Sequence, residues 1–229
     1  MFAANATHRA VSTAIGAERS PILCIDDFFA NPELLVECAA QAHYIDVGPL
    51  YPGVRAPAPA EYVQMLLKAV GPEVERVFGT PPEEDLELCA FSMVTAPASA
   101  LRHAQRIPHF DGPEPRRFAF LHYLCAPHFG GTSFYRHRST GFESVTPERL
   151  MIYRSAVERE LRASQPAAAY MNGDTEVFEQ VHSVAAAYNR LVIYRGNLLH
   201  SGDIPAALPL IEDPRQGRLT INGFGFLRA

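Results

Sequence analysis

The second half of the chain is divided into short runs of β-forming residues, and this series constrains the fold more than any other feature. Val, Ile, Thr, Tyr and Phe dominate the runs, while Gly, Pro and Asn lie between them, as in strands joined by turns. The runs are LELCAFSMVTA (86–96), RFAFLHYLCA (117–126), GGTSFYRH (130–137), RLVIYRGNLLHSG (190–202) and GRLTINGFGFL (217–227). Many short strands in succession are typical of a β-barrel or a β-sandwich.

Three further segments have the apolar spacing of helices: residues 32–42, 60–78 and 147–163. A proline in the first turn supports the first and the third, because a helix start leaves that N–H group unpaired in any case. Gly71-Pro72 is expected to kink or split the second helix, since proline removes a helical hydrogen bond. The stripe of apolar residues along each segment predicts that all three helices pack against the strands.

The length and the composition predict one α+β domain over residues 1–229. A chain of 229 residues with 48% apolar residues can bury one sizeable core. Because helices precede most of the strands, we expect residues 1–85 to be mainly a helical support, with one apolar strand over PILCIDDFF (21–29). Residues 86–229 are expected to form the β core, with the helix near 147–163 inserted into it.

Charge and hydropathy exclude two kinds of partner. The formal net charge is −5, and the basic residues are scattered, so the sequence offers no electrostatic footprint for nucleic acid. No apolar run approaches the roughly 20 residues of a membrane-spanning helix, and the first residues lack the pattern of an export signal. We therefore expect a cytoplasmic protein without a membrane partner, and take a homodimer as the default assembly.

The most informative motif is His109-Phe110-Asp111, because residues two apart on a strand point to the same face. An imidazole and a carboxylate so placed can share one metal ion, and a second histidine would complete a facial triad with open positions for reactants. His200 fits that third place best, since it ends a β-rich run in the second half. His182 is the strongest rival, but the residues after it resemble a loop that enters a strand. A His-x-Asp pair alone is weak evidence, because many proteins contain one by chance.

A second motif, Arg218-Leu219-Thr220, lies on the last predicted strand and places a guanidinium and a hydroxyl group on one face. Arginine offers a planar fork of donors that matches a carboxylate, and the threonine hydroxyl adds a neutral donor. Arg215 is a competing candidate, because a proline-rich insertion separates this strand from His200. We prefer Arg218, since Arg215 lies between Pro214 and Gly217 in an apparent loop.

With these motifs, residues 105–226 resemble the Fe(II)- and 2-oxoglutarate-dependent dioxygenases of the prolyl-hydroxylase-like branch. The run FLHYLCAPHFGGTSFYRH is similar to a strand pair of that branch, and Tyr123 matches its cosubstrate-binding tyrosine. The resemblance implies a double-stranded β-helix, a jelly-roll or cupin-like barrel with N-terminal supporting helices. It also implies that Fe(II) binds the triad, and that Tyr123, Arg218 and Thr220 hold the distal carboxylate of 2-oxoglutarate. Hydroxylation or desaturation is favoured over halogenation, because position 111 keeps its carboxylate.

The substrate side of the site is less defined, and a small molecule or an amino-acid or peptide side chain is expected beside O2. Weaker candidates for substrate contact are Arg55, Tyr135, Arg138, Arg195, Asn197 and Asn222. The proline-rich residues 51–59, read as an irregular loop, and residues 136–145 are expected to fold over the metal as lids.

Two other functions remain open from the sequence. A cupin-like protein that binds a metal or a small acid without oxidising anything would have a very similar sequence. A zinc hydrolase could use the same three ligands, but no H-E-x-x-H element supplies the general base that it would need.

Overall fold

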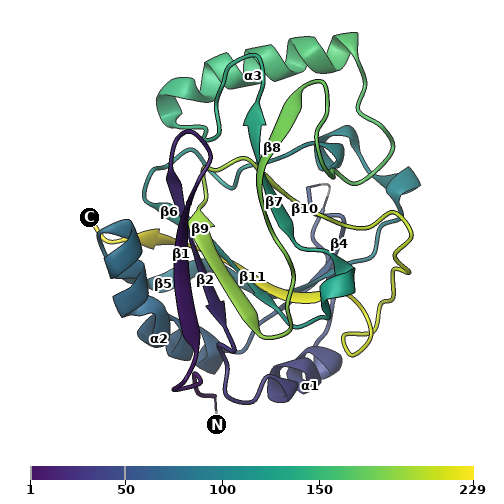
Figure 1. Ribbon diagram of the computed structural model, residues 1–229. Helices are drawn as coiled ribbons and strands as arrows, with labels where there is room; N and C mark the ends of the chain where they lie inside the picture. Colours follow the sequence, from purple (N-terminus) through teal and green to yellow (C-terminus); the bar gives the residue numbers. More distant parts are fainter. Residues whose placement is uncertain (1, 49) are drawn as a thin grey trace.

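The computed structural model describes residues 2–48 and 50–229 (Figure 1). Its helices are α1 (Glu33–Gln41), α2 (Ala60–Phe78) and α3 (Pro147–Ala163). The strands of the first part of the chain are β1 (Arg9–Ile15), β2 (Ser20–Asp26), β3 (Ile45–Asp46), β4 (Gly53–Pro57) and β5 (Pro82–Val94). Those of the second part are β6 (Arg117–Tyr123), β7 (Thr132–His137), β8 (Phe178–Val184), β9 (Arg190–Arg195), β10 (His200–Gly202) and β11 (Leu219–Leu227).

Within the described residues the strands form two antiparallel sheets, which confirms the α+β class at this level. The larger sheet has the order β1-β2-β9-β6-β11-β5-β4-β3, and the smaller one has the order β10-β7-β8. Neighbours such as β11 and β6 are far apart in the sequence, with Thr220 opposite Tyr123 and Ile221 opposite His122. No ladder joins the two sheets into a closed barrel in the described part of the chain.

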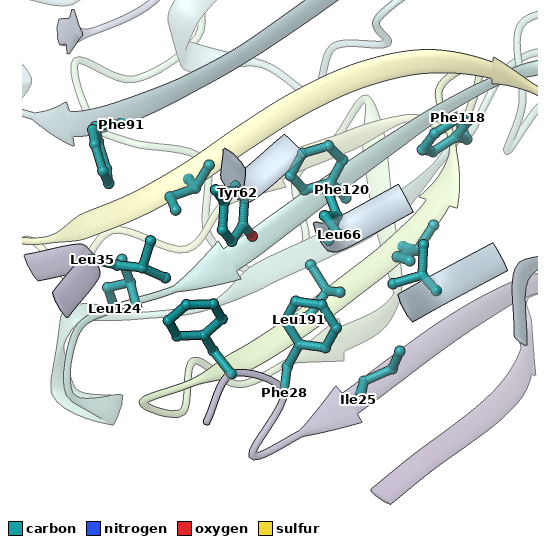
Figure 2. Close-up of a cluster of buried hydrophobic side chains, with 14 of the residues drawn as sticks. Ile25, Phe28, Leu35, Tyr62, Leu66, Phe91, Phe118, Phe120, Leu124 and Leu191 are labelled. Carbon is teal, nitrogen blue, oxygen red and sulfur yellow. The ribbon is translucent and has the colours of Figure 1, made fainter. Parts of the chain in front are cut away.

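One face of the larger sheet is covered by α1 and α2, and the main hydrophobic core lies between these helices and the sheet. Leu219 and Ile221 of β11 are fully buried in this core, together with Tyr62 and Leu66 of α2. Figure 2 shows Phe118, Phe120 and Leu191 from the strands beside these helix residues. Because alternate residues of a strand point to opposite faces, Arg218, Thr220 and Asn222 face the other side, toward the smaller sheet.

The three predicted helices are present, and α2 is continuous through Pro72. Of the two expected effects of Gly71-Pro72, the split of the helix is therefore wrong. Leu66, Val70 and Val74 are buried on its sheet-facing side, and this packing holds the helix together where proline removes one backbone hydrogen bond. Among the described helices, none has the length and the apolar content needed to span a lipid bilayer.

The first 85 residues differ from the expected helical support, because they supply strands β1 to β4 and the start of β5 to the larger sheet. Residues 53–57, predicted as an irregular loop, form β4, which pairs with both β3 and β5. Pro57 is tolerated at the end of this strand, next to the short β3, where few ladder hydrogen bonds are needed. Strand β8, which contains His182, is likewise not among the strands predicted from the sequence.

Candidate metal and carboxylate site

The backbone of two separate segments brings the three predicted metal ligands together. His109 and His200 form an isolated antiparallel bridge, with N–O distances of 2.9 Å and 2.8 Å in the two directions. The amide of Asp111 donates to the carbonyl of Gly196 at 2.7 Å. The segment 109–111 is thereby fixed against the connection between β9 and β10. One ligand atom from each side chain lies within 4.8 Å of the other two.

The two imidazoles are oriented with a nitrogen toward the carboxylate. His200 donates from Nδ1 to the carbonyl of Leu198 at 2.9 Å, so its Nε2 carries a lone pair. That Nε2 lies 3.7 Å from Asp111 Oδ2, and Nε2 of His109 lies 3.9 Å from Asp111 Oδ1. A hydrogen bond from the other ring nitrogen is the usual way in which proteins orient a metal-binding histidine.

The protonation states of the triad suit a cation. Burial lowers the pKa of His109 and of His200 to about 4, so both imidazoles are neutral at pH 7. Burial raises the pKa of Asp111 to about 6, and its Oδ2 is buried without a hydrogen-bond partner. The side chain of His109 is 57% exposed because one side of it borders a cavity. Protein atoms surround the cavity, so the ring is still enclosed by the protein. Two neutral imidazoles and an unsatisfied carboxylate fit a divalent metal ion.

The triad borders a cavity of about 410 Å³. This cavity lies against the face of the larger sheet that the helices leave uncovered, and β10 of the smaller sheet borders it as well. Arg218, which immediately precedes β11, lines it, as do Asn222 and Phe224 of β11, Leu121 of β6 and Arg55 of β4. A cavity of this size is near the lower end of the range for small-molecule sites, so it suits small ligands.

Arg218 is the cation placed to bind an anion in this cavity. Its residue is 5% exposed, and it donates from Nε to Phe129 O and from Nη2 to Gly131 O, both at 3.1 Å. Its Nη1 has no hydrogen-bond partner among the described residues. Asp203 accepts hydrogen bonds from Ser133 and Ser183 and makes no ion pair with Arg218. A buried guanidinium held by backbone carbonyls keeps its charge available for a ligand carboxylate.

Arg215, the competing candidate, lies on the surface. Its Nε and Nη2 donate to the carboxylate of Glu37 at 3.0 Å and 2.7 Å. It is not among the residues that line the cavity.

Tyr123 and Thr220 lie behind the cavity wall. The hydroxyl of Tyr123 is 2.7 Å from that of Thr132, which lines the cavity. Thr220 donates from Oγ1 to Oδ1 of Asn222 at 2.6 Å, and Asn222 also lines the cavity. Tyr123 and Thr220 therefore do not line the cavity themselves, and each is hydrogen-bonded to a residue that does. The structure adds Thr132, Tyr51 and Tyr170 to its polar lining. Thr132 belongs to the Gly-Gly-Thr turn, so its motif was visible in the sequence.

Of the weaker substrate candidates, Arg55 and Asn222 line the cavity, whereas Tyr135, Arg138, Arg195 and Asn197 do not. Tyr135 packs in the cluster under α3, because strand alternation places it on the face of β7 opposite to Thr132 and Phe134. Arg138 pairs with Asp174 at the surface. Arg195 points to the opposite face of β9, where it donates to the carbonyls of Pro115 and Phe78. The cavity lining therefore does not support the expected substrate contacts of these four residues.

The structure also locates His122, the rival ligand His182 and the two expected lids. His122 faces away from Tyr123, as strand alternation predicts, but it is buried under α2 and bonded to Tyr62. His182 lies on β8 opposite Phe134 of β7, which separates it from His200 of β10, and it is not part of the metal-ligand cluster. Of the two expected lids, Tyr51, Pro52 and Arg55 line the cavity, whereas residues 136–145 do not.

The comparison with solved structures finds a similar fold in HygX and SnoN, in agreement with the fold that the sequence resemblance implies. HygX from Streptomyces hygroscopicus, solved with nickel and 2-oxoglutarate bound, has a TM-score of 0.53 at 14% identity, over 91% of this chain and 84% of HygX. SnoN, a non-haem α-ketoglutarate-dependent epimerase from nogalamycin biosynthesis, has a TM-score of 0.52 at 9% identity, over 90% of this chain and 78% of SnoN. At these identities the likeness concerns the fold.

The chain itself belongs to the DUF6445 family. The family model, described as a family of unknown function, matches residues 6–225, which is nearly the whole chain. No curated protein matches the chain in sequence.

Proposed function

We propose that this protein is an Fe(II)- and 2-oxoglutarate-dependent oxygenase with a double-stranded β-helix core. The observation that carries the proposal is one cavity that is bordered both by an unsatisfied His-Asp-His triad and by a buried arginine without an acidic partner. The likeness to HygX and SnoN supports the same fold.

In this proposal His109, Asp111 and His200 hold the iron, and Arg218 holds the distal carboxylate of 2-oxoglutarate. Thr132 and Asn222 contribute polar atoms at the cavity wall, and Tyr123 and Thr220 fix these two side chains from behind. When bound, iron and 2-oxoglutarate with O2 supply the oxidising power for hydroxylating an unreactive C–H bond. Three protein ligands leave the other coordination positions open for reactants.

The remaining lining separates the reaction from water. Leu121, Ile204 and Phe224 are apolar, and Tyr194 borders the triad, with its ring 4.9 Å from that of His200. Packed apolar walls exclude water, which would otherwise compete for the open coordination positions. The space beside the cosubstrate suits a small molecule, or a single amino-acid or peptide side chain.

The cavity is poorly equipped for a zinc hydrolase. Asp111 is the one carboxylate among the described residues that line it, and a metal ligand cannot also serve as the general base. Burial raises the pKa of Tyr51 and of Tyr194, so their hydroxyl groups stay protonated at neutral pH and no phenolate is present to act as the base. Hydrolysis needs a group that removes a proton from the metal-bound water, and the lining lacks one.

The proposal is tested by anaerobic titration of the metal-free protein with Fe(II) and 2-oxoglutarate, followed by the visible charge-transfer absorption of the chelate. We expect the band to be absent in His109→Ala and to need much more 2-oxoglutarate in Arg218→Ala. Arg215→Ala is the matched control, because it removes a surface arginine from the same segment, and it should titrate like the wild type. Metal binding without the band would favour a binding protein or a zinc enzyme instead.

A further inference from the structure

A second arginine, Arg55 of β4, borders the cavity and has no role in the proposed binding of iron and 2-oxoglutarate. Arg55 lies opposite Ser92 on β5, and Ser92 lies opposite Thr220 on β11. The three side chains therefore point to the same face of the sheet, the one that borders the cavity. The inference below rests on the proposed function.

The guanidinium of Arg55 is held in place but is not neutralised. Its Cζ lies 4.2 Å from the centre of the Tyr51 ring, a stacking contact that fixes the plane of the group. Its Nε is buried without a hydrogen-bond partner. It forms no ion pair with a described residue, whereas cations outside the cavity such as Arg117 and Arg190 pair with carboxylates.

This arrangement is costly without a ligand. Taking a charge out of water is unfavourable unless an opposite charge or hydrogen bonds compensate it. Burial lowers the pKa of Arg55, yet an arginine side chain stays protonated at neutral pH. An immobilised guanidinium with unused donors at a cavity wall is the arrangement that binds planar anions, carboxylates above all.

Arg55 and Arg218 are held at different parts of the cavity wall. Arg55 stacks on Tyr51 and lines the cavity together with His109 and Asp111. Arg218 is held by the carbonyls of Phe129 and Gly131, and its Cζ lies 5.9 Å from the centre of the Tyr123 ring. Tyr51 also lines the cavity, and its buried hydroxyl has no hydrogen-bond partner, so it adds an unused donor beside Arg55.

We propose that Arg55 binds a second carboxylate in this cavity, near the metal ligands and separate from the carboxylate held by Arg218. The source of this carboxylate is either an acidic substrate, which makes small organic acids the substrate class, or the metal-side end of 2-oxoglutarate. Leu50, Ile107 and Phe110 also line the cavity, so an acidic substrate would carry an apolar body. Two experiments separate these sources.

The first experiment measures calorimetric binding of 2-oxoglutarate to the nickel-loaded protein, because nickel avoids turnover. Arg55→Gln, Arg218→Gln and the surface control Arg215→Gln are compared with the wild type. Arg218→Gln should weaken binding about 10- to 100-fold, as expected for the loss of a charge-assisted pair, and Arg215→Gln should have no effect. A similar loss in Arg55→Gln assigns the second carboxylate to 2-oxoglutarate.

The second experiment keeps nickel and 2-oxoglutarate saturating and titrates pairs of an acid and its primary amide, namely hexanoate with hexanamide and 3-phenylpropanoate with 3-phenylpropanamide. If the carboxylate is the substrate's, the wild type should bind the acids at least about tenfold more tightly than the amides. Arg55→Gln should remove this preference while leaving 2-oxoglutarate binding intact. Arg55→Lys keeps the charge but loses the fork, so it should retain part of the preference.

The proposal is overturned if Arg55→Gln, folded by its thermal transition, behaves like Arg215→Gln in both experiments. Failure of the proposed function is a different result, because the wild type would then bind no 2-oxoglutarate with nickel. In that case the acid and amide pairs, titrated without 2-oxoglutarate, still test whether Arg55 holds a carboxylate.

Discussion

At the scale of single residues, the candidate site contains a carboxylate that the protein alone does not stabilise. Asp111 is buried, its Oδ2 accepts no hydrogen bond, and both neighbouring imidazoles are neutral at pH 7. Burial therefore raises its pKa to about 6 from the ordinary 3.8. A group whose pKa rises on folding lowers the stability of the protein when it is ionised.

We predict that Asp111→Asn stabilises the metal-free protein and abolishes metal binding. At pH 3 both the folded and the unfolded wild type carry a largely protonated Asp111, so the two proteins should differ little. As the pH rises from 3 to 7, the wild type should lose up to about 3 kcal/mol relative to Asp111→Asn, because the native state binds more protons in this window. Urea unfolding at several pH values, with EDTA present, measures the difference. A variant less stable than the wild type at pH 7 would show that Asp111 is satisfied in the metal-free protein.

At the scale of elements, helix α2 is attached to the sheet by a buried polar chain as well as by apolar contacts. Tyr62 of α2 lies 3.0 Å from Nδ1 of His122 on β6, and Nε2 of His122 lies 3.0 Å from Oδ1 of Asn189. The amide of Asn189 donates to the carbonyl of Phe29, so its Oδ1 is an acceptor and His122 carries its proton on Nε2. Nδ1 of His122 must then accept from the Tyr62 hydroxyl.

We predict that Tyr62→Phe lowers the free energy of unfolding by about 1–3 kcal/mol, because it leaves Nδ1 of the buried His122 without a donor. The effect should be the same at pH 6 and pH 8, since burial lowers the pKa of His122 to about 4 and keeps the ring neutral. Chemical unfolding measures the change in stability. Metal affinity should be unchanged, because the hydrogen-bonded side chains of Tyr62 and His122 lie on the helix side of the sheet. Tyr188→Phe, an exposed tyrosine, is the control. A loss confined to pH 6 would contradict the assigned tautomer.

At the scale of the whole molecule, the triad joins parts of the chain that are far apart in the sequence. His200 begins β10 of the smaller sheet, whereas His109 and Asp111 precede β6 of the larger sheet. A metal ion that binds all three therefore binds the folded protein and not the unfolded chain. Such a ligand stabilises the native state by mass action.

We predict that nickel with 2-oxoglutarate, each free at about 100 times its dissociation constant, stabilises the protein by at least about 2.7 kcal/mol. For a chain of this length the melting temperature should rise by roughly 5–10 °C. His200→Ala should remove the shift, and His103→Ala, which changes an exposed histidine outside the triad, should keep it. Thermal unfolding with and without the ligands provides the measurement. An equal shift in His200→Ala would place the metal elsewhere.

The sequence alone determined what depends on local order along the chain. Helices α1, α2 and α3, the β-rich second half and the placing of His109 and Asp111 on one face follow from periodicity, proline positions and strand alternation. The tertiary structure decided what depends on pairing between distant segments. It showed that the prolines near Arg55 end a sheet strand, that Arg215 pairs with Glu37 at the surface, and that Tyr123 and Thr220 reach the cavity through partners. Strand order and side-chain burial are set by contacts across the fold, and no local pattern encodes them.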